Sequence, residues 1–232
     1  MIVSINQPGY LPWLGYFDRI ARSDLHIVLD HVQFEKNSFT NRNKIRSGSG
    51  WTWLTVPVRT KGKFNDLPIN GIAIDKTRPW ARKHRDSLRL EYSKAPYFER
   101  YWSWLEAQYE RSWECLGGLL RELNDFLLRE LNVDTKLIYS SDLGVAGRKD
   151  DLVLNLCSEV GATTYLSGPL GRDYLHPYRF REAGIALEFH DYVHPRYGQI
   201  HKDFLPNMSV IDLLLNQGPK AGEIMYDDSE RQ

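Results

Sequence analysis

Side chains that could do chemistry gather in the first part of the chain. Asp30 follows an apolar run at residues 26–29, where a carboxylate could accept the proton of an attacking amine. Gln7 and Tyr10 follow a second apolar run, at residues 2–5, and could orient a substrate. We predict Asp30 as a catalytic base and Gln7 and Tyr10 as substrate-binding residues. The alternative is that all three satisfy local backbone groups in turns and at strand ends.

Asp30 is followed directly by His31, and a carboxylate beside an imidazole could act together on a proton. Successive residues of a strand point to opposite faces, however. We therefore expect at most one of the two to face the ligand, and we favour Asp30.

A basic stretch at residues 41–44 is the candidate for anion recognition. Arg42 could hold a phosphate or carboxylate through two parallel hydrogen bonds, and Lys36 could add a point charge. Gln33 and Asn41 lie close in sequence and are further candidate substrate contacts. The alternative is a solvated basic loop in which Arg42 pairs with a nearby carboxylate.

Ser167 and Gly168 end an apolar run at residues 163–166. A hydroxyl and a backbone N–H at such a turn could contact an anion, and Tyr174 lies in the same turn region. All three are predicted to bind substrate. The alternative is a plain turn from strand to helix.

His194 is a second candidate catalytic residue, and it lies between His190 and His201. Zinc needs three or four converging ligands. Spacing of His190 and His194 would suit a helix, but Pro195 and the preceding apolar run argue against one. We expect no metal site.

Alternating strands and helices must position these residues. The order strand 2–5, helix after Pro12, strand 26–29 is a βαβ unit, which favours parallel strands with ligands beyond their carboxyl ends. We predict an α/β fold with a mainly parallel sheet and a long loop at residues 31–50. Further strands are predicted at residues 51–58, 67–74, 135–140, 163–166 and 185–190.

The domain prediction follows from the same pattern. Residues 1–76 and 132–225 are predicted to form the α/β core. Residues 77–131 carry helical periodicity, broken near Pro96, and are predicted to be a helical insertion. Residues 226–232 are predicted to be a disordered tail.

Composition narrows the class of protein. The chain has 232 residues, of which 42% are hydrophobic and 26% charged, and its formal net charge is zero. Zero net charge provides no overall field to recruit nucleic acid or anionic membrane. The sequence has no signal peptide and no run near the roughly 20 apolar residues of a membrane span, so we expect a cytoplasmic protein without membrane contact.

Five stretches resemble the WbqC-like family over nearly the whole chain: QPGYLPWLGYFDRI, DHVQFEKNSFTNRNKI, WTWLTVPV, ATTYLSGPLGRDYL and FLPNMSVIDLLLNQG. This resemblance implies a role in surface-polysaccharide and amino-sugar pathways such as O-antigen synthesis, with transfer of glycine to an amino sugar. The start of the chain is also similar to nucleotidyltransferase-like enzymes such as pantothenate synthetase. That similarity implies a Rossmann-type core that binds a nucleotide, although both histidines of the HIGH-type motif are missing here.

Three functions remain open. The first is a transferase or amide-forming ligase that acts on a nucleotide-linked amino sugar, with ATP or another nucleotide supplying activation. The second is a non-catalytic module that binds a nucleotide sugar or a protein. The third is an acyltransferase that takes its acyl group from aminoacyl-tRNA, with basic residues at 76–89 contacting the tRNA.

Overall fold

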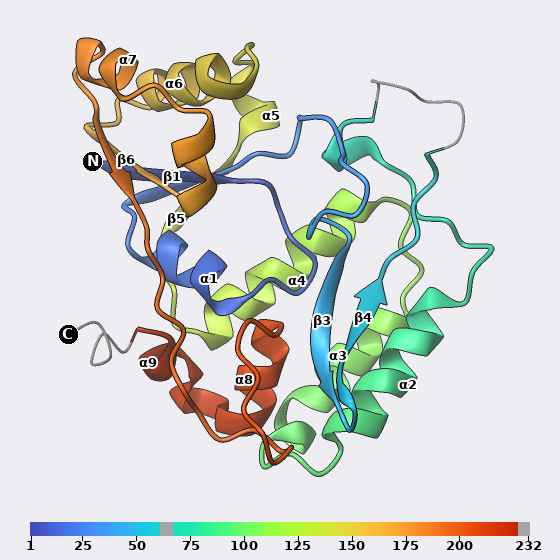
Figure 1. The fold of residues 1–232 in the computed structure, drawn as a ribbon. Coiled ribbons are helices and arrows are strands. Elements are labelled where there is room, and N and C mark those ends of the chain that lie inside the picture. The colour runs from blue at the N-terminus through green and yellow to red at the C-terminus, as the bar shows by residue number, and fades with distance from the viewer. Residues whose placement is uncertain (61–66, 227–232) are drawn as a thin grey trace.

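The computed structural model describes residues 1–60 and 67–226. Within these residues the chain forms a five-stranded parallel sheet and a separate two-stranded hairpin (Figure 1). The spatial order of the sheet is β5 (Lys136–Tyr139), β2 (Leu25–Val28), β1 (Ile2–Asn6), β6 (Thr164–Ser167) and β7 (Ala186–Phe189). The predicted α/β class with a parallel sheet is confirmed.

The direction in which successive strands are added to the sheet reverses between β1 and β6, although the strands themselves stay parallel. The chain builds β1, β2 and β5 toward one edge, then returns to the other side of β1 for β6 and β7. Neighbouring strands pair in parallel throughout, including the predicted strands at 2–5, 26–29 and 163–166. In Rossmann-like sheets, ligands bind beyond the carboxyl ends of the strands at such a reversal.

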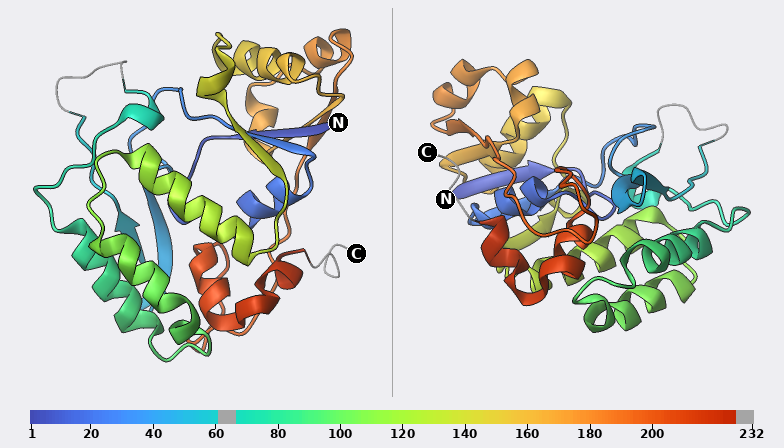
Figure 2. Two further views of the ribbon diagram at one scale, coloured as in Figure 1. Left: turned by 180° about the vertical axis from the view of Figure 1, so that it is seen from behind. Right: turned by 60° about the horizontal axis from the view of Figure 1, so that its bottom comes forward.

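Helices cover both faces of the sheet (Figures 1 and 2). One face packs on α1 (Leu14–Ala21) and α4 (Leu116–Glu130), and the other on α6 (Lys149–Glu159) and α7 (Pro177–Glu182). Apolar residues at helical spacing make this possible, because Leu116, Leu120, Leu123 and Leu127 are all fully buried on α4. The sheet therefore has a core on each side, and its carboxyl edge remains for a site.

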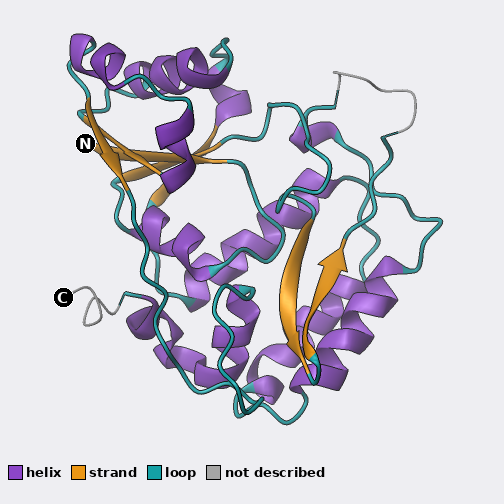
Figure 3. Ribbon diagram, in the orientation of Figure 1, coloured by secondary structure: helices purple, strands orange, loops and turns teal. Residues whose placement is uncertain are grey.

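A second layer of the fold is built from the hairpin and its helices (Figure 3). The hairpin of β3 (Arg42–Ser47) and β4 (Gly50–Thr55) packs near α2 (Trp80–Tyr92) and α8 (Val210–Gln217). The remaining elements are η1 (Ile69–Gly71), α3 (Phe98–Glu110), α5 (Ser140–Leu143), η2 (Pro169–Asp173), η3 (Gly218–Lys220) and α9 (Ala221–Met225).

Two predicted elements are wrong. Residues 31–50 do not form one long loop, because β3 begins at Arg42. The sequence pattern did not predict this strand because it contains the polar residue Asn43. In the structure Asn43 is buried and donates to the carbonyl of Leu11 at 2.6 Å. Residues 67–74 do not form a regular strand either. Pro68 precedes a short 3-10 turn there, and extended pairing is limited to isolated bridges.

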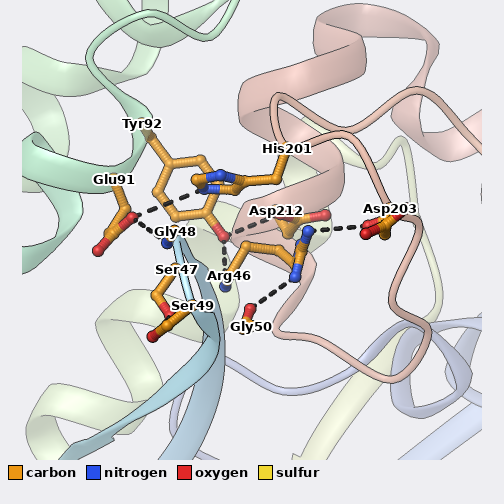
Figure 4. A network of polar contacts seen from close by, with 10 residues as sticks. All are labelled: Arg46, Ser47, Gly48, Ser49, Gly50, Glu91, Tyr92, His201, Asp203 and Asp212. Atoms are coloured by element: carbon orange, nitrogen blue, oxygen red, sulfur yellow. Dashed lines mark hydrogen bonds and ion pairs between the residues drawn. The ribbon is translucent and has the colours of Figure 1, made fainter.

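The segment between β7 and α8 is held to the hairpin by a buried polar network (Figure 4). The Tyr92 hydroxyl donates to Asp212 at 2.9 Å and accepts from the backbone N–H of Arg46 at 3.0 Å. The Arg46 guanidinium donates to the Asp203 carbonyl at 2.8 Å. Burial raises the pKa of Asp212, and hydrogen bonds from Tyr197 and Tyr92 oppose that rise. Four separate segments are thereby fixed to one another.

The predicted helical insertion contains three helices, α2, α3 and α4, and its predicted break near Pro96 lies between α2 and α3. These helices share one hydrophobic core with α1, β3, β4 and α8. The domain division itself stays a prediction. The predicted tail lies, after Tyr226, outside the described residues. In the described part of the chain, no helix is both long and apolar enough to cross a membrane.

Candidate functional site

A cavity of about 270 Å³ opens at the carboxyl edge of the sheet, beside β2 and β5. Its walls come from α1, η1 and α4 as well as from the sheet. Apolar side chains make up much of these walls, and Asp30, Arg121 and Asn124 add polar groups that could bind a ligand. The lining residues are Pro8, Tyr16, Ile20, Val28, Asp30, Asn70, Gly117, Gly118, Leu120, Arg121, Asn124, Leu128, Leu137 and Tyr139. A largely apolar cavity with a few polar groups at this edge fits a small-molecule site.

The Asp30 carboxylate forms one wall of the cavity and is held from several sides. One oxygen accepts from the Ser140 hydroxyl at 3.1 Å and from the Ser141 backbone N–H at 3.0 Å. The other accepts from the Ser141 hydroxyl at 2.8 Å and from Asn70 at 3.4 Å. Asp30 is buried, and these donors fix the direction of its carboxylate.

His31 reaches the same group through Ser140. Its Nδ1 lies 2.6 Å from the Ser140 hydroxyl, which itself donates to Asp30. Because that hydroxyl has one proton, the shared geometry requires the Nδ1–H tautomer of His31. Asp30 lines the cavity and His31 does not, so the expectation that at most one of the two faces a ligand stays a prediction. Both residues lie past the end of β2, where strand alternation no longer applies.

The opposite wall of the cavity favours negative charge. Gly117 and Gly118 lie in the first turn of α4, where backbone N–H groups lack helical partners. Gly117 is required there because an added Cβ would lie 2.9 Å from the backbone of Asn70. One turn later, the Arg121 guanidinium stacks 3.7 Å from the Tyr139 ring. Anionic groups of a ligand would be stabilised on this side.

Asn124 supplies a free acceptor. Its Nδ2 donates to the carbonyls of Gly9, at 3.0 Å, and Leu120, at 2.7 Å. These bonds fix the amide orientation and leave Oδ1 buried with no hydrogen-bond partner among the described residues. A ligand N–H or O–H could satisfy it.

Of the predicted catalytic and substrate-binding residues, Asp30 lines this cavity, whereas Gln7, Tyr10, Arg42 and Ser167 do not. Tyr10 is fully buried, and its hydroxyl lies 2.9 Å from His84 Nδ1 and 2.8 Å from the Tyr109 hydroxyl. Burial raises the pKa of Tyr10 well above its ordinary value. The structure therefore places Tyr10 in the core, and its role as a substrate contact stays a prediction.

Three other predicted residues bind neighbouring chain segments. Arg42 donates to the Asn37 carbonyl at 2.6 Å and stacks 4.3 Å from the Trp53 ring. The Gln7 side chain accepts from Thr40 at 3.4 Å, and Asn41 donates to the Val56 carbonyl at 2.8 Å. Asn41 is buried, whereas Arg42 and Gln7 are half-buried.

The remaining predicted substrate contacts lie apart from the cavity. Gln33 accepts from the backbone N–H of Leu67 at 3.1 Å, and Lys36 is exposed. Ser167 is buried and donates to the Gly168 carbonyl at 3.1 Å. Tyr174 follows η2, beyond the end of β6, and 40% of its surface is exposed.

His194 lies in an aromatic cluster on the segment after β7. Its Nδ1 lies 2.8 Å from the Pro195 carbonyl, and its ring contacts Tyr192, Tyr197 and Phe204. Burial lowers the pKa of His194. It does not line the cavity that holds Asp30, so the structure does not bring the two predicted catalytic residues together.

Several of the basic residues at 76–89 pair with nearby carboxylates. Arg78 lies 3.8 Å from Asp75, and Arg82 lies 3.5 Å from Asp86. Lys76 pairs with Glu114. A tRNA contact at this patch stays a prediction.

Sequence reasoning missed several residues that line the cavity or hold its Asp30 carboxylate. Ser140 ends the predicted strand 135–140 and Ser141 follows it, which was a usable signal for the partners of Asp30 at the carboxyl edge. Arg121 and Asn124 lie inside a helical stretch whose remaining pattern indicates only core packing.

The fold defines an α/β protein with a Rossmann-like parallel sheet and a cavity at the carboxyl edge of its strands. The chain belongs to the WbqC-like protein family, whose sequence model matches residues 7–224. It is 38% identical over 225 residues to the uncharacterized protein Rv1507c of Mycobacterium tuberculosis, and the match covers 96% of each chain. No solved structure gives a significant match.

Proposed function

We propose that this chain is a transferase or amide-forming ligase that acts on a nucleotide-linked amino sugar. The observation that supports the proposal is a single cavity whose lining includes the oriented Asp30 carboxylate, the first turn of α4 and Arg121. An amino sugar linked to a nucleotide has both groups that such a cavity would distinguish: an amine that needs a base, and phosphates that need cationic partners.

In this proposal Asp30 accepts the proton that the sugar amine loses when it attacks an activated carboxyl carbon. Its Ser140, Ser141 and Asn70 partners hold the carboxylate in one direction, which lowers the cost of reaching the reactive geometry. His31 lies behind Ser140 and completes a hydrogen-bonded path from imidazole to carboxylate. Asn124 Oδ1 is an acceptor for a sugar hydroxyl or amine.

Glycine is the acyl group that the family resemblance suggests, and ATP or another nucleotide is the proposed source of activation. Arg121 and the first turn of α4 would stabilise phosphate charge of either ligand. Surface-polysaccharide synthesis is the proposed setting.

The test is a turnover assay on the purified chain with nucleotide-linked amino sugars, ATP and glycine, read by mass spectrometry. Gain of one glycyl group on the sugar is the expected result. Matched nucleotide sugars with a hydroxyl in place of the amine are the control, and they should remain unmodified. Modification of both classes would contradict an amine as the acceptor group. Binding of the sugar without any turnover would contradict the proposal that the chain catalyses this transfer.

One observation favours a second candidate, a non-catalytic binding module. The Asp30 carboxylate accepts from the backbone N–H of Ser141 at 3.0 Å, in the first turn of α5, so it also serves as a cap for that helix. If capping is its whole role, nucleotide sugars would bind without being converted. The same assay separates the two candidates.

A further inference from the structure

Arg19 is a buried cation on α1 that the proposed function does not use. Only 5% of its surface is exposed. Its Nε is buried without a hydrogen-bond partner, and no hydrogen bond or ion pair joins the guanidinium to any described residue. Buried charges are ordinarily paired, because an unpaired one loses its hydration without replacement. The guanidinium therefore lacks an anion.

The guanidinium lies at the reversal point of the sheet. A Cβ added to Gly168 would lie 2.0 Å from Arg19 Nη1, so that nitrogen lies directly against the Gly168 backbone. Gly168 follows the carboxyl end of β6, which pairs with β1 where the strand order reverses. Any other residue at position 168 would displace Arg19. The glycine thus makes room for the guanidinium at the edge where Rossmann-like sheets bind ligands.

The surroundings of Arg19 contain hydroxyl groups instead of carboxylates. Burial lowers the pKa of Arg19, and the nearby phenol groups of Tyr165, Tyr16 and Tyr174 oppose this shift. Asp18, its neighbour in sequence, is bonded to His190 and Arg22. Tyrosine hydroxyls can donate to an anion that Arg19 would bind.

Solvent access to this region exists at Tyr174, which is 40% exposed. On the other side, His26 Nε2 is buried with no hydrogen-bond partner among the described residues. Burial lowers the pKa of His26 to about 3, so the imidazole is neutral and does not compete with Arg19 for an anion. Among these neighbours of Arg19, Tyr174 is the one that reaches solvent.

We propose that Arg19 is the anchor of an oxyanion site in the crevice between β1 and β6, and that it binds a phosphate or carboxylate group of a small ligand beside Gly168. Two guanidinium nitrogens suit the paired oxygens of either group. This site is separate from the Asp30 cavity, whose walls do not include Arg19 or Gly168. The proposal goes beyond the proposed function and does not depend on it.

The test compares the full chain with Arg19→Met and Arg22→Met by thermal unfolding, with inorganic phosphate, pyrophosphate or glycine added at constant ionic strength. Arg22 is the matched control because it caps the carboxyl end of the same helix and pairs with Asp18 at 2.7 Å. The parent should be stabilised by at least one of the three probes. The probe that acts identifies the ligand group: phosphate for the first two and carboxylate for glycine.

Arg19→Met should lose this response, with an apparent affinity at least about tenfold weaker. Without added anion it should melt at or above the parent temperature, because an uncompensated buried charge is removed. Arg22→Met should melt lower and keep the response. The proposal is overturned if the parent responds to none of the probes, if Arg19→Met responds as the parent does, or if Arg19→Met melts well below the parent.

Arg19→Lys adds a check on geometry. It keeps the charge and loses the fork, so part of the response should remain. A full response in Arg19→Lys would argue against paired contacts. Failure of these tests leaves amino-sugar turnover at the Asp30 cavity unaffected, so the two proposals fail separately.

Discussion

Asp18 Oδ2 lies 2.6 Å from His190 Nε2, and this buried pair joins α1 to the first residue after β7. Burial by itself raises the pKa of Asp18, but hydrogen bonds from His190 and Arg22 outweigh it and leave the pKa below its ordinary value. The pair fixes α1 under the sheet, and α1 supplies walls to both proposed sites.

Asp18→Asn should lower the free energy of unfolding at neutral pH by about 3 kcal/mol, because a buried carboxylate that pairs with Arg22 and is hydrogen-bonded to His190 loses its charge. Since the folded pKa is the lower one, Asp18 stabilises the fold fully above its unfolded pKa of about 3.9 and less as pH falls further. Urea unfolding at several pH values measures this. The gap to the parent should narrow below about pH 4.

Asp151→Asn is the control for that variant, because Asp151 pairs with Arg179 while 61% of its side chain is exposed. It should change stability by at most about 1 kcal/mol. Equal losses in the two variants would mean that burial of Asp18 contributes nothing.

His26→Gln should reduce the sensitivity of the fold to acid. Burial lowers the pKa of His26 to about 3, and Arg19 adds to that shift. Between about pH 6.5 and 3 the unfolded chain binds a proton that the folded chain does not, so acidification costs up to about 1.4 kcal/mol per pH unit. Unfolding free energies at pH 7.5, 6 and 5 should fall less steeply in the variant. Parallel slopes would show that His26 is not neutral in the parent.

Tyr92→Phe and Tyr101→Phe form a matched pair. Both residues are buried on neighbouring helices, but Tyr92 bonds to Asp212 and Arg46, whereas the Tyr101 hydroxyl has no partner among the described residues. Tyr92→Phe should cost about 1–3 kcal/mol in unfolding free energy, because it leaves buried polar groups unsatisfied. Tyr101→Phe should be neutral or stabilising. The reverse order would contradict the network in Figure 4.

Asp30→Asn tests the proposed chemistry in the turnover assay. The amide oxygen can still accept from Ser140 and Ser141, but it cannot take up a proton. We expect turnover to fall about 10²–10⁴-fold, the usual effect of losing a general base, with substrate affinity little changed. Loss of affinity with normal turnover at saturation would make Asp30 a binding residue.

The parallel sheet could be predicted because its strands are short apolar runs that alternate with helical periods. The position of Asp30 followed from the end of β2. The hairpin strand β3 could not be predicted, since its buried polar residues Asn43 and Arg46 donate to the distant carbonyls of Leu11 and Asp203. Sequence pattern records hydrophobicity and local turns, and it does not record which distant carbonyl a polar side chain meets.

Sequence pattern also could not predict which residues line the cavity. Arg42 and Arg121 are both basic residues near aromatic ones, yet Arg42 binds the Asn37 carbonyl and Arg121 lines the cavity. That difference arises from how α4 crosses the sheet edge, which depends on contacts between segments far apart in the chain.

The most direct measurement of the central claim is calorimetric titration of a nucleotide-linked amino sugar into the parent, Arg121→Met and Arg42→Met. A charge-assisted contact to phosphate contributes about 1.5–3 kcal/mol. If the ligand occupies the Asp30 cavity, Arg121→Met should weaken binding by at least about tenfold and Arg42→Met should bind like the parent. If Arg42→Met loses the affinity while Arg121→Met keeps it, the ligand binds at the basic stretch of residues 41–44, and the cavity beside β2 and β5 is not the site.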